Sequence, residues 1–178
     1  MEKRNEFLRS MVETSLLVAA AYILSLIKLW EMPFGGSVTA VSMLPLVFIG
    51  LRRGPKWGFA GCLVYGLIDF VLGKTYSIHI ASILGDYILA WGAMGVAGFF
   101  KDKKHGVWMA IPAACFARFV FVFATGVTIW AEYTPEGMPV WLYSLTYNGG
   151  YIGVEMVLMF AVCALIGKQL PRLTNPTH

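Results

Sequence analysis

Long apolar runs separated by short polar segments dominate the hydropathy pattern of this chain. The six runs cover residues 11–27, 38–51, 57–72, 78–100, 107–130 and 141–166. A membrane-spanning helix needs roughly 20 mainly apolar residues, and most of these runs come close to that length or exceed it. The pattern therefore predicts an all-α integral membrane fold, a six-transmembrane-helix bundle. We expect a single membrane domain over residues 1–172 and a disordered tail over 173–178.

The second run differs from the others because it is short and contains Pro45. At 1.5 Å per residue its helix covers only about 21 Å of a hydrocarbon core about 30 Å thick. We expect this helix to be tilted, broken or half-buried against its neighbours. The preceding segment contains Pro33 and Gly35-Gly36, which cannot continue a helix, so a long loop is predicted between the first two helices.

Composition limits the classes of function that the chain can have. Of its 178 residues, 58% are hydrophobic and 13% are charged, with a mean hydropathy of +0.68, which leaves no room for a soluble catalytic domain. The letters GKT at Gly73 to Thr75 lack the earlier glycine of a phosphate-binding loop, because position 68 is Ile. Serine-nucleophile signatures and metal-ligand spacings are absent as well. We therefore expect neither an enzyme nor a cofactor or metal site.

The basic residues are distributed unevenly between the two sides that six spans would create. Eleven of the fourteen Lys and Arg residues fall on one side: Lys3, Arg4, Arg9, Arg52, Arg53, Lys56, Lys101, Lys103, Lys104, Lys168 and Arg172. The opposite loops hold only Lys28 and Lys74, and Arg118 lies inside the fifth run. Cytoplasmic loops are enriched in Lys and Arg. We therefore predict a multi-pass protein of the cell membrane with both termini in the cytoplasm.

Besides Glu13 near the start of the first run, four charged residues lie within the apolar runs, namely Asp69, Asp86, Arg118 and Glu155. Charges inside the hydrocarbon region are costly and commonly mark functional sites. Arg118 and Glu155 lie at similar depth, about 18 and 20 Å from the same ends of their helices. We hypothesise that these two form a buried ion pair, which leaves Asp86 to meet a cationic ligand.

Aromatic and small residues gather near the same helix ends. They are Tyr76, Tyr87, Trp130, Tyr143 and Tyr147, with Asn148 and Gly126 nearby. Steps of four lead from Arg118 through Val122 and Gly126 to Trp130 along one helix face. An acid, an amide, a gap at glycine and several aromatic faces suit a flat, cationic, aromatic ligand. Membrane interfaces also attract Trp and Tyr, so an interfacial role remains open for Trp130 and Tyr143.

Several stretches resemble one known family. They are GGSVTAVSMLPLVFIGLRRGPKWG, the region from Gly85-Asp86-Tyr87 to GVAGFF, ARFVFVFATGVTIW, and YSLTYNGGY. They resemble the thiamine-specific S components, the substrate-binding subunits of energy-coupling-factor (ECF) vitamin transporters. The resemblance implies a six-helix bundle that captures thiamine, or a close precursor or analogue, from the extracellular side, with the first loop as a lid. It also implies two kinds of partner besides the lipid bilayer: a transmembrane coupling protein and two ATPases.

The resemblance further implies roles for single residues. The implied substrate-binding residues are Asp86, Tyr87, Tyr76, Arg118, Gly126, Trp130, Tyr143 and Asn148. Ser15 and Ala19 fall at the positions that dock the coupling protein; their spacing alone fits packing within the bundle equally well. Val122 stands where the family has a ligand-contacting histidine, and the lid tryptophan of some members corresponds to Gly35-Gly36. Without the histidine, affinity is expected to fall or the preferred compound to be a related pyrimidine or thiazole.

Two other classes of protein fit the residues themselves. A proton- or ion-coupled secondary transporter of a small cationic aromatic solute would use Asp69, Asp86 and Glu155 as a relay along one continuous path. A membrane assembly protein without a small ligand would use the same polar residues to hold its helices together.

Overall fold

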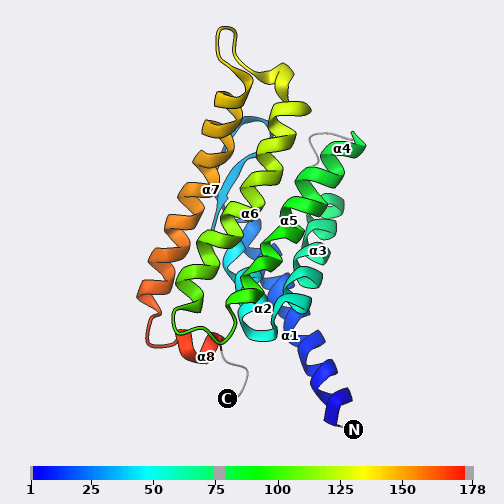
Figure 1. Cartoon of the computed structure of the whole chain (residues 1–178), viewed down its shortest axis with the longest axis vertical. Helices are drawn as coiled ribbons and strands as arrows, with labels where there is room; N and C mark the ends of the chain where they lie inside the picture. The colour runs from blue at the N-terminus through cyan, green and yellow to red at the C-terminus, as the bar shows by residue number, and fades with distance from the viewer. Residues whose placement is uncertain (1, 74–78, 175–178) are drawn as a thin grey trace.

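The computed structural model describes residues 2–73 and 79–174, and nearly all of these residues belong to a bundle of helices (Figure 1). Five helical segments in this part of the chain are long and apolar enough to cross a membrane. They are α1 (Glu2–Ser25), α3 (Pro55–Leu72), the stretch from Ile80 to Phe100, α6 (Gly106–Thr128) and α7 (Val140–Leu165). The predicted all-helical, multi-pass membrane fold is confirmed.

The second helix, α2 (Met43–Arg53), has only 11 residues and is short, as predicted. Every residue from Met43 to Leu51 is buried. A helix that is apolar on all sides is stable only where protein surrounds it, which explains how so short a helix is accommodated. Pro45 lies in the first turn, where its missing N–H leaves no hydrogen bond unmade. The helix begins five residues later than predicted, because residues 38 and 39 belong to a strand.

That strand is part of a β-hairpin that the sequence predicted only as a loop. β1 (Lys28–Glu31) and β2 (Ser37–Thr39) pair in antiparallel fashion, and a 3₁₀ turn, η1 (Pro33–Gly35), connects them. β2 packs against α7, and Figure 1 shows the hairpin running behind α6 and α7. Only β2 faces the interior, where Val38 and Thr39 are buried, whereas every residue of β1 is exposed.

The helix between Ile80 and Phe100 changes its winding three times. It consists of α4 (Ile80–Ser82), the π-helix η2 (Ile83–Leu89), α5 (Ala90–Ala93) and the 3₁₀ helix η3 (Met94–Phe100). π-Helical turns are rare and occur often at functional sites. Asp86 and Tyr87 lie within η2, so the irregular winding determines where both side chains point.

The two ends of the described chain lie at the same end of the bundle, which fits an even number of crossings (Figure 1). The short helix α8 (Leu170–Thr174) packs there against α2. Arg52 donates hydrogen bonds to the carbonyl oxygens of Arg172 (3.3 Å) and Leu173 (2.7 Å). Residues 173 and 174, which the sequence analysis assigned to the tail, belong to α8; residues 175–178 lie outside the described residues.

Glu13 lies within α1 and has basic partners on the next helix. Its carboxylate accepts hydrogen bonds from Arg53 Nε (2.8 Å) and Arg52 Nε (3.3 Å). The ion pairs fasten α1 to the end of α2, which explains why an acid is tolerated within an apolar helix.

Candidate ligand-binding site

A cavity of about 330 Å³ lies inside the bundle. The last turns of α1 and α3, the end of α6 and the start of α7 surround its opening, which we call the mouth. Seven of the predicted site residues line it: Asp86, Tyr87, Arg118, Gly126, Trp130, Tyr143 and Asn148. The eighth, Tyr76, lies outside the described residues. These seven residues come from three separate spans and meet in one cavity.

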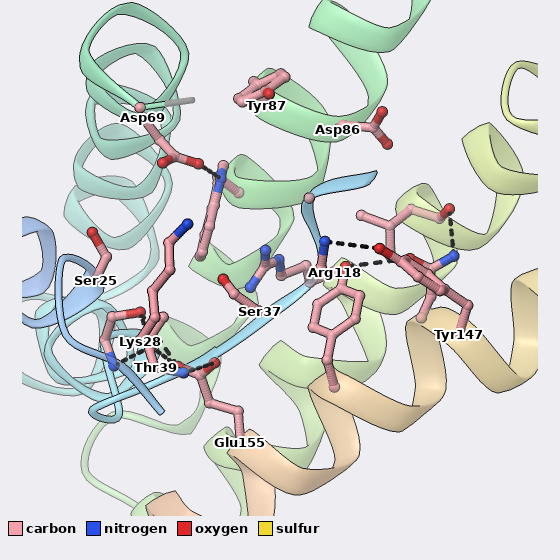
Figure 2. A pocket seen from close by; sticks show the side chains of 18 of the residues that line it. Ser25, Lys28, Ser37, Thr39, Asp69, Asp86, Tyr87, Arg118, Tyr147 and Glu155 are labelled. Atoms are coloured by element: carbon pink, nitrogen blue, oxygen red, sulfur yellow. Dashed lines mark hydrogen bonds between the residues drawn. The ribbon is translucent and has the colours of Figure 1, made fainter. Parts of the chain in front are cut away.

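Asp86 lies at the mouth and is held by three hydrogen-bond donors. Its Oδ2 accepts from Ser82 Oγ (2.8 Å) and from Trp130 Nε1 (3.0 Å). Its Oδ1 accepts from Thr125 Oγ1. Donors to a carboxylate stabilise its charged form and fix its direction. Figure 2 shows the Asp86 side chain beside Tyr87 at the upper edge of the cavity.

Trp130 lies just beyond the end of α6, not within the helix as the predicted segment placed it. Its indole N–H is fixed by Asp86, and its ring lies 5.6 Å from that of Tyr133. The acid and the aromatic face therefore adjoin each other.

Gly126 does not provide the open gap that the sequence suggested. A Cβ atom at this position would lie 2.2 Å from Ser144 Oγ and 3.0 Å from Asn148 Nδ2. The glycine instead allows α6 and α7 to come close together. Asn148 Nδ2 then donates across this contact to the carbonyl oxygen of Val122 (3.2 Å), and its Oδ1 accepts from Tyr151 (3.3 Å).

A row of tyrosines on α7 lines one side of the cavity. The ring centroids of Tyr143 and Tyr147 are 5.7 Å apart, and those of Tyr147 and Tyr151 are 6.0 Å apart. Tyr87 packs instead against Phe70 of α3, at 5.4 Å between centroids. Aromatic faces therefore border the cavity from two directions.

The hairpin between α1 and α2 is fastened to this row of tyrosines. Tyr147 Oη accepts a hydrogen bond from the backbone N–H of Gly36 (2.9 Å) and donates to the carbonyl oxygen of Pro33. A Cβ at Gly36 would lie 2.8 Å from Tyr151 Cδ1, so only glycine fits there. The hairpin tip thus lies closed against α7.

Arg118 reaches the middle of the cavity, and no carboxylate of the described residues forms an ion pair with it. Its guanidinium carbon lies 3.5 Å from the ring centroid of Trp91, and Nη1 donates to Met43 Sδ (2.9 Å). Its Nε is buried and donates no hydrogen bond within the described part of the chain. The hypothesis of an Arg118–Glu155 ion pair was wrong, since the ion pairs of the described residues do not include it.

Glu155 has other partners, which explain why the pair does not form. The side chain is 1% exposed and lies on the floor of the cavity. Its Oε1 accepts from Thr39 Oγ1 (2.7 Å), Ser42 Oγ (3.3 Å) and the backbone N–H of Met43 (3.4 Å). Met43 is the first residue of α2, so the carboxylate neutralises the positive end of that helix.

Asp69 also lines the cavity, near the end of α3. Its Oδ2 accepts a hydrogen bond from Trp91 Nε1 (2.9 Å). The sequence singled out Asp69 only as one member of a possible proton relay. Among the described residues, Asp69, Asp86 and Glu155 are each bonded to different donors, and no hydrogen bond joins one acid to another.

Several lining residues escaped sequence reasoning, among them Trp91, Ser144 and Tyr151. So did Thr125, which donates a hydrogen bond to Asp86. Ser82 had a detectable signal, because it lies one helical turn before Asp86. Trp91 had none, since a tryptophan in an apolar run is ordinarily a packing residue.

The charges around the cavity are unequal. Among the described residues, three carboxylates line it, from Asp69, Asp86 and Glu155, against the two cations Arg118 and Lys28. Lys28 is already paired with Glu31 of the hairpin at 2.7 Å. The cavity is therefore negative overall and suits a ligand with one positive charge.

Ser15 and Ala19 lie away from the cavity on α1. Both are exposed, whereas Thr14, Val18 and Ala21 are buried against the rest of the bundle. Their spacing fitted either packing within the bundle or docking of a partner. Because both side chains are exposed, they do not pack within this chain.

Comparison with known proteins finds relatives along almost the whole chain. The profile of the family described as "Thiamine transporter protein (Thia_YuaJ)" matches residues 11–175. The protein "Thiamine transporter ThiT" of Bacillus subtilis is 32% identical over 178 residues, which cover 92% of each chain. The protein of the same name from Lacticaseibacillus paracasei is 30% identical over 91% of this chain and 88% of its own.

A solved structure shares the fold. The structure of ThiT from Listeria monocytogenes matches with a TM-score of 0.84 at 24% identity, over 96% of this chain and 100% of that one. The profile match, over residues 11–175, includes the residues that surround the cavity. The chain belongs to the thiamine transporter protein (Thia_YuaJ) family.

Proposed function

We propose that this chain is the substrate-binding subunit of an ECF-type importer and that it captures thiamine, or a close precursor or analogue, from the extracellular side. The observation that carries the proposal is the contact of Asp86 with Trp130 at the mouth of a cavity lined by more acids than bases. Thiamine carries one positive charge, on an aromatic thiazolium ring that a methylene group joins to an aminopyrimidine. A carboxylate beside an aromatic face attracts such a cation by charge and by cation–π interaction.

The remaining cavity residues supply contacts for the uncharged parts of the ligand. Tyr87 and Tyr143 offer aromatic faces, and Arg118 offers donors for a hydroxyl oxygen or a ring nitrogen. Asn148 is bonded within the protein, so it acts by keeping α6 and α7 in place. Val122 gives an apolar wall where a hydrogen-bonding residue would strengthen the contact.

The hairpin acts as the lid in this proposal. Its tip is bonded to Tyr147, and those two hydrogen bonds must break before the ligand can leave. A lid that excludes water strengthens the charge interaction beneath it.

The proposed orientation places both termini in the cytoplasm and the mouth on the extracellular side of the cell membrane. It is supported by the basic residues around α2 and α8, at the opposite end of the bundle from the mouth. The proposed partners are a transmembrane coupling protein and two ATPases. Exposed Ser15 and Ala19 allow the close approach of a partner helix.

Titration of the purified, detergent-solubilised protein with thiamine tests the ligand. Because Trp130 and Trp91 both line the cavity, we expect saturable quenching of tryptophan fluorescence with one site per chain. Pyrithiamine, which keeps a cationic ring, should compete. The uncharged hydroxymethylpyrimidine half of thiamine should bind far more weakly. Absence of saturable quenching would overturn the proposal.

Substitution of the exposed small residues tests the partner surface. Ser15→Leu with Ala19→Leu should leave thiamine binding to the isolated subunit unchanged and abolish co-purification with the coupling protein. Val64→Leu, at an exposed apolar position on α3, is the matched control and should preserve the complex. Retention of the complex in the double variant would contradict this docking surface.

A further inference from the structure

We infer that Asp69 and Trp91 are positioning residues for Arg118, and that together they hold its guanidinium so that unused N–H donors meet an acceptor atom of the ligand. This inference rests on the proposed function, in which Arg118 contacts the ligand. Neither Asp69 nor Trp91 belongs to the set of residues that the family resemblance implied for binding.

The first step is the hydrogen bond between Asp69 and Trp91, which the dashed line from Asp69 marks in Figure 2. It joins the last turn of α3 to α5 at 2.9 Å between Oδ2 and Nε1. Tyr65 contacts the same indole in an edge arrangement at 4.5 Å and 72°. The Trp91 side chain is 5% exposed. With its N–H bonded and its ring packed, the plane of Trp91 is fixed.

The second step is the contact between that plane and Arg118. The guanidinium carbon lies 3.5 Å from the ring centroid, the distance of direct stacking. A carboxylate that accepts the indole N–H polarises the ring and makes its face more negative. Asp69 therefore strengthens the hold on Arg118 without touching it.

The third step concerns what Arg118 still lacks. Nη1 is bonded to Met43 Sδ, a weak acceptor, and the buried Nε has no acceptor in the described part of the chain. A carboxylate partner would accept hydrogen bonds from these N–H groups. Stacking on an aromatic ring uses only the face of the guanidinium and leaves the N–H groups in the guanidinium plane available. A buried cationic donor without an acceptor is costly, so a ligand atom that accepts its hydrogen bond gains affinity. On thiamine, a hydroxyl oxygen or a pyrimidine nitrogen has this chemistry.

A double-mutant cycle separates positioning from contact. Asp69→Asn and Trp91→Phe are measured singly and together, and Asp69→Asn is also measured in an Arg118→Met background. Trp91→Phe keeps an aromatic face, although a smaller one, and removes the N–H donor. We expect Asp69→Asn to weaken thiamine binding about tenfold, the size of one charge-assisted hydrogen bond. The loss should disappear in the Trp91→Phe and Arg118→Met backgrounds. Glu136→Gln, at an exposed acid outside the cavity, is the matched control.

Two outcomes of the cycle would overturn the inference. If Asp69→Asn keeps its full tenfold effect in the Trp91→Phe background, Asp69 contacts the ligand itself. If Asp69→Asn lowers the melting temperature but leaves affinity unchanged, Asp69 serves only the fold.

A readout without ligand keeps this test distinct from that of thiamine binding. In the ligand-free protein, the Nε–H resonance of Arg118, assigned by its loss in Arg118→Met, should be displaced by the ring current of Trp91. Asp69→Asn should reduce that displacement. If wild-type protein fails to bind thiamine but shows the displacement and its reduction, the proposed function is wrong and the positioning is supported. No change of the resonance in Asp69→Asn would contradict the positioning.

Discussion

Asp86 at the mouth of the cavity and Glu155 on its floor are both carboxylates, yet their partners differ. The donors to Asp86 are side chains on three separate segments, and one of them, Trp130, is itself a proposed ligand contact. The donors to Glu155 lie between the end of β2 and the start of α2, and two of them are backbone N–H groups, of Thr39 and Met43. The same chemical group is therefore placed in two different settings within one cavity.

The difference lies in what remains for a ligand. Asp86 is partly exposed to the cavity, so its charge can meet a cation. Glu155 is almost fully enclosed and serves the turn, where Val41 has a φ of 54°, a conformation that is costly for a β-branched residue. Burial and partners, rather than residue type, distinguish a binding acid from a structural one.

The largest effect on stability is expected at Glu155, on the floor of the cavity. Glu155→Ala should lower the free energy of unfolding by about 3 kcal/mol, because it leaves the donors of the β2–α2 turn buried and unpaired. Denaturant or thermal unfolding in detergent measures the change. Glu155→Gln, which keeps an acceptor, should lose clearly less. If Glu155→Ala were as stable as the wild type, the structural role of this acid would be refuted.

The next largest effect on stability is expected at Gly126, where α6 and α7 form the cavity wall between mouth and floor. Gly126→Ala should destabilise the protein by about 2 kcal/mol, because the new methyl group overlaps Ser144 Oγ and separates α6 from α7. The second substitution Ser144→Gly should recover most of the loss. Gly150→Ala is the matched control, since a Cβ there meets nothing within 4 Å. Equal stability of the two alanine variants would show that the close contact does not matter.

The smallest effect is expected at the lid. Tyr147→Phe removes two hydrogen bonds to the hairpin tip and should accelerate thiamine dissociation about tenfold. This factor corresponds to a loss of about 1.4 kcal/mol in the stability of the closed lid. Stopped-flow fluorescence with excess unlabelled competitor measures the rate. Thr146→Ala, on the exposed side of the same helix, should leave the rate unchanged. An unchanged rate in Tyr147→Phe would mean that these bonds do not limit release.

Much of the fold could be predicted, because apolar runs of membrane length determine helices almost by themselves. The short second helix was also foreseen from its length and Pro45. The hairpin was not, since a strand pair of three and four residues gives no periodic signal that stands apart from a loop. The membership in a transporter family agrees with the prediction that the chain is not an enzyme.

The cavity was predicted in part, and the reason is chemical. Asp86 and Arg118 stood out because charges are rare in apolar helices, and the structure brings both to one cavity. The depth of a charged residue along its helix did not reveal which partner its side chain contacts. Glu155 turned out to bond Thr39 and Ser42, and Arg118 to stack on Trp91. Those partners depend on the hairpin and on the π-helical turn, which the hydropathy pattern does not reveal.

The most direct test compares Asp86→Asn with the wild type by calorimetric titration with thiamine. The account predicts saturable binding at one site in the wild type, about 100-fold weaker binding in Asp86→Asn, as expected for loss of a buried charge partner, and an unchanged melting temperature. Glu136→Gln should bind like the wild type. Equal affinity of Asp86→Asn and the wild type, or no binding by either, would contradict the account.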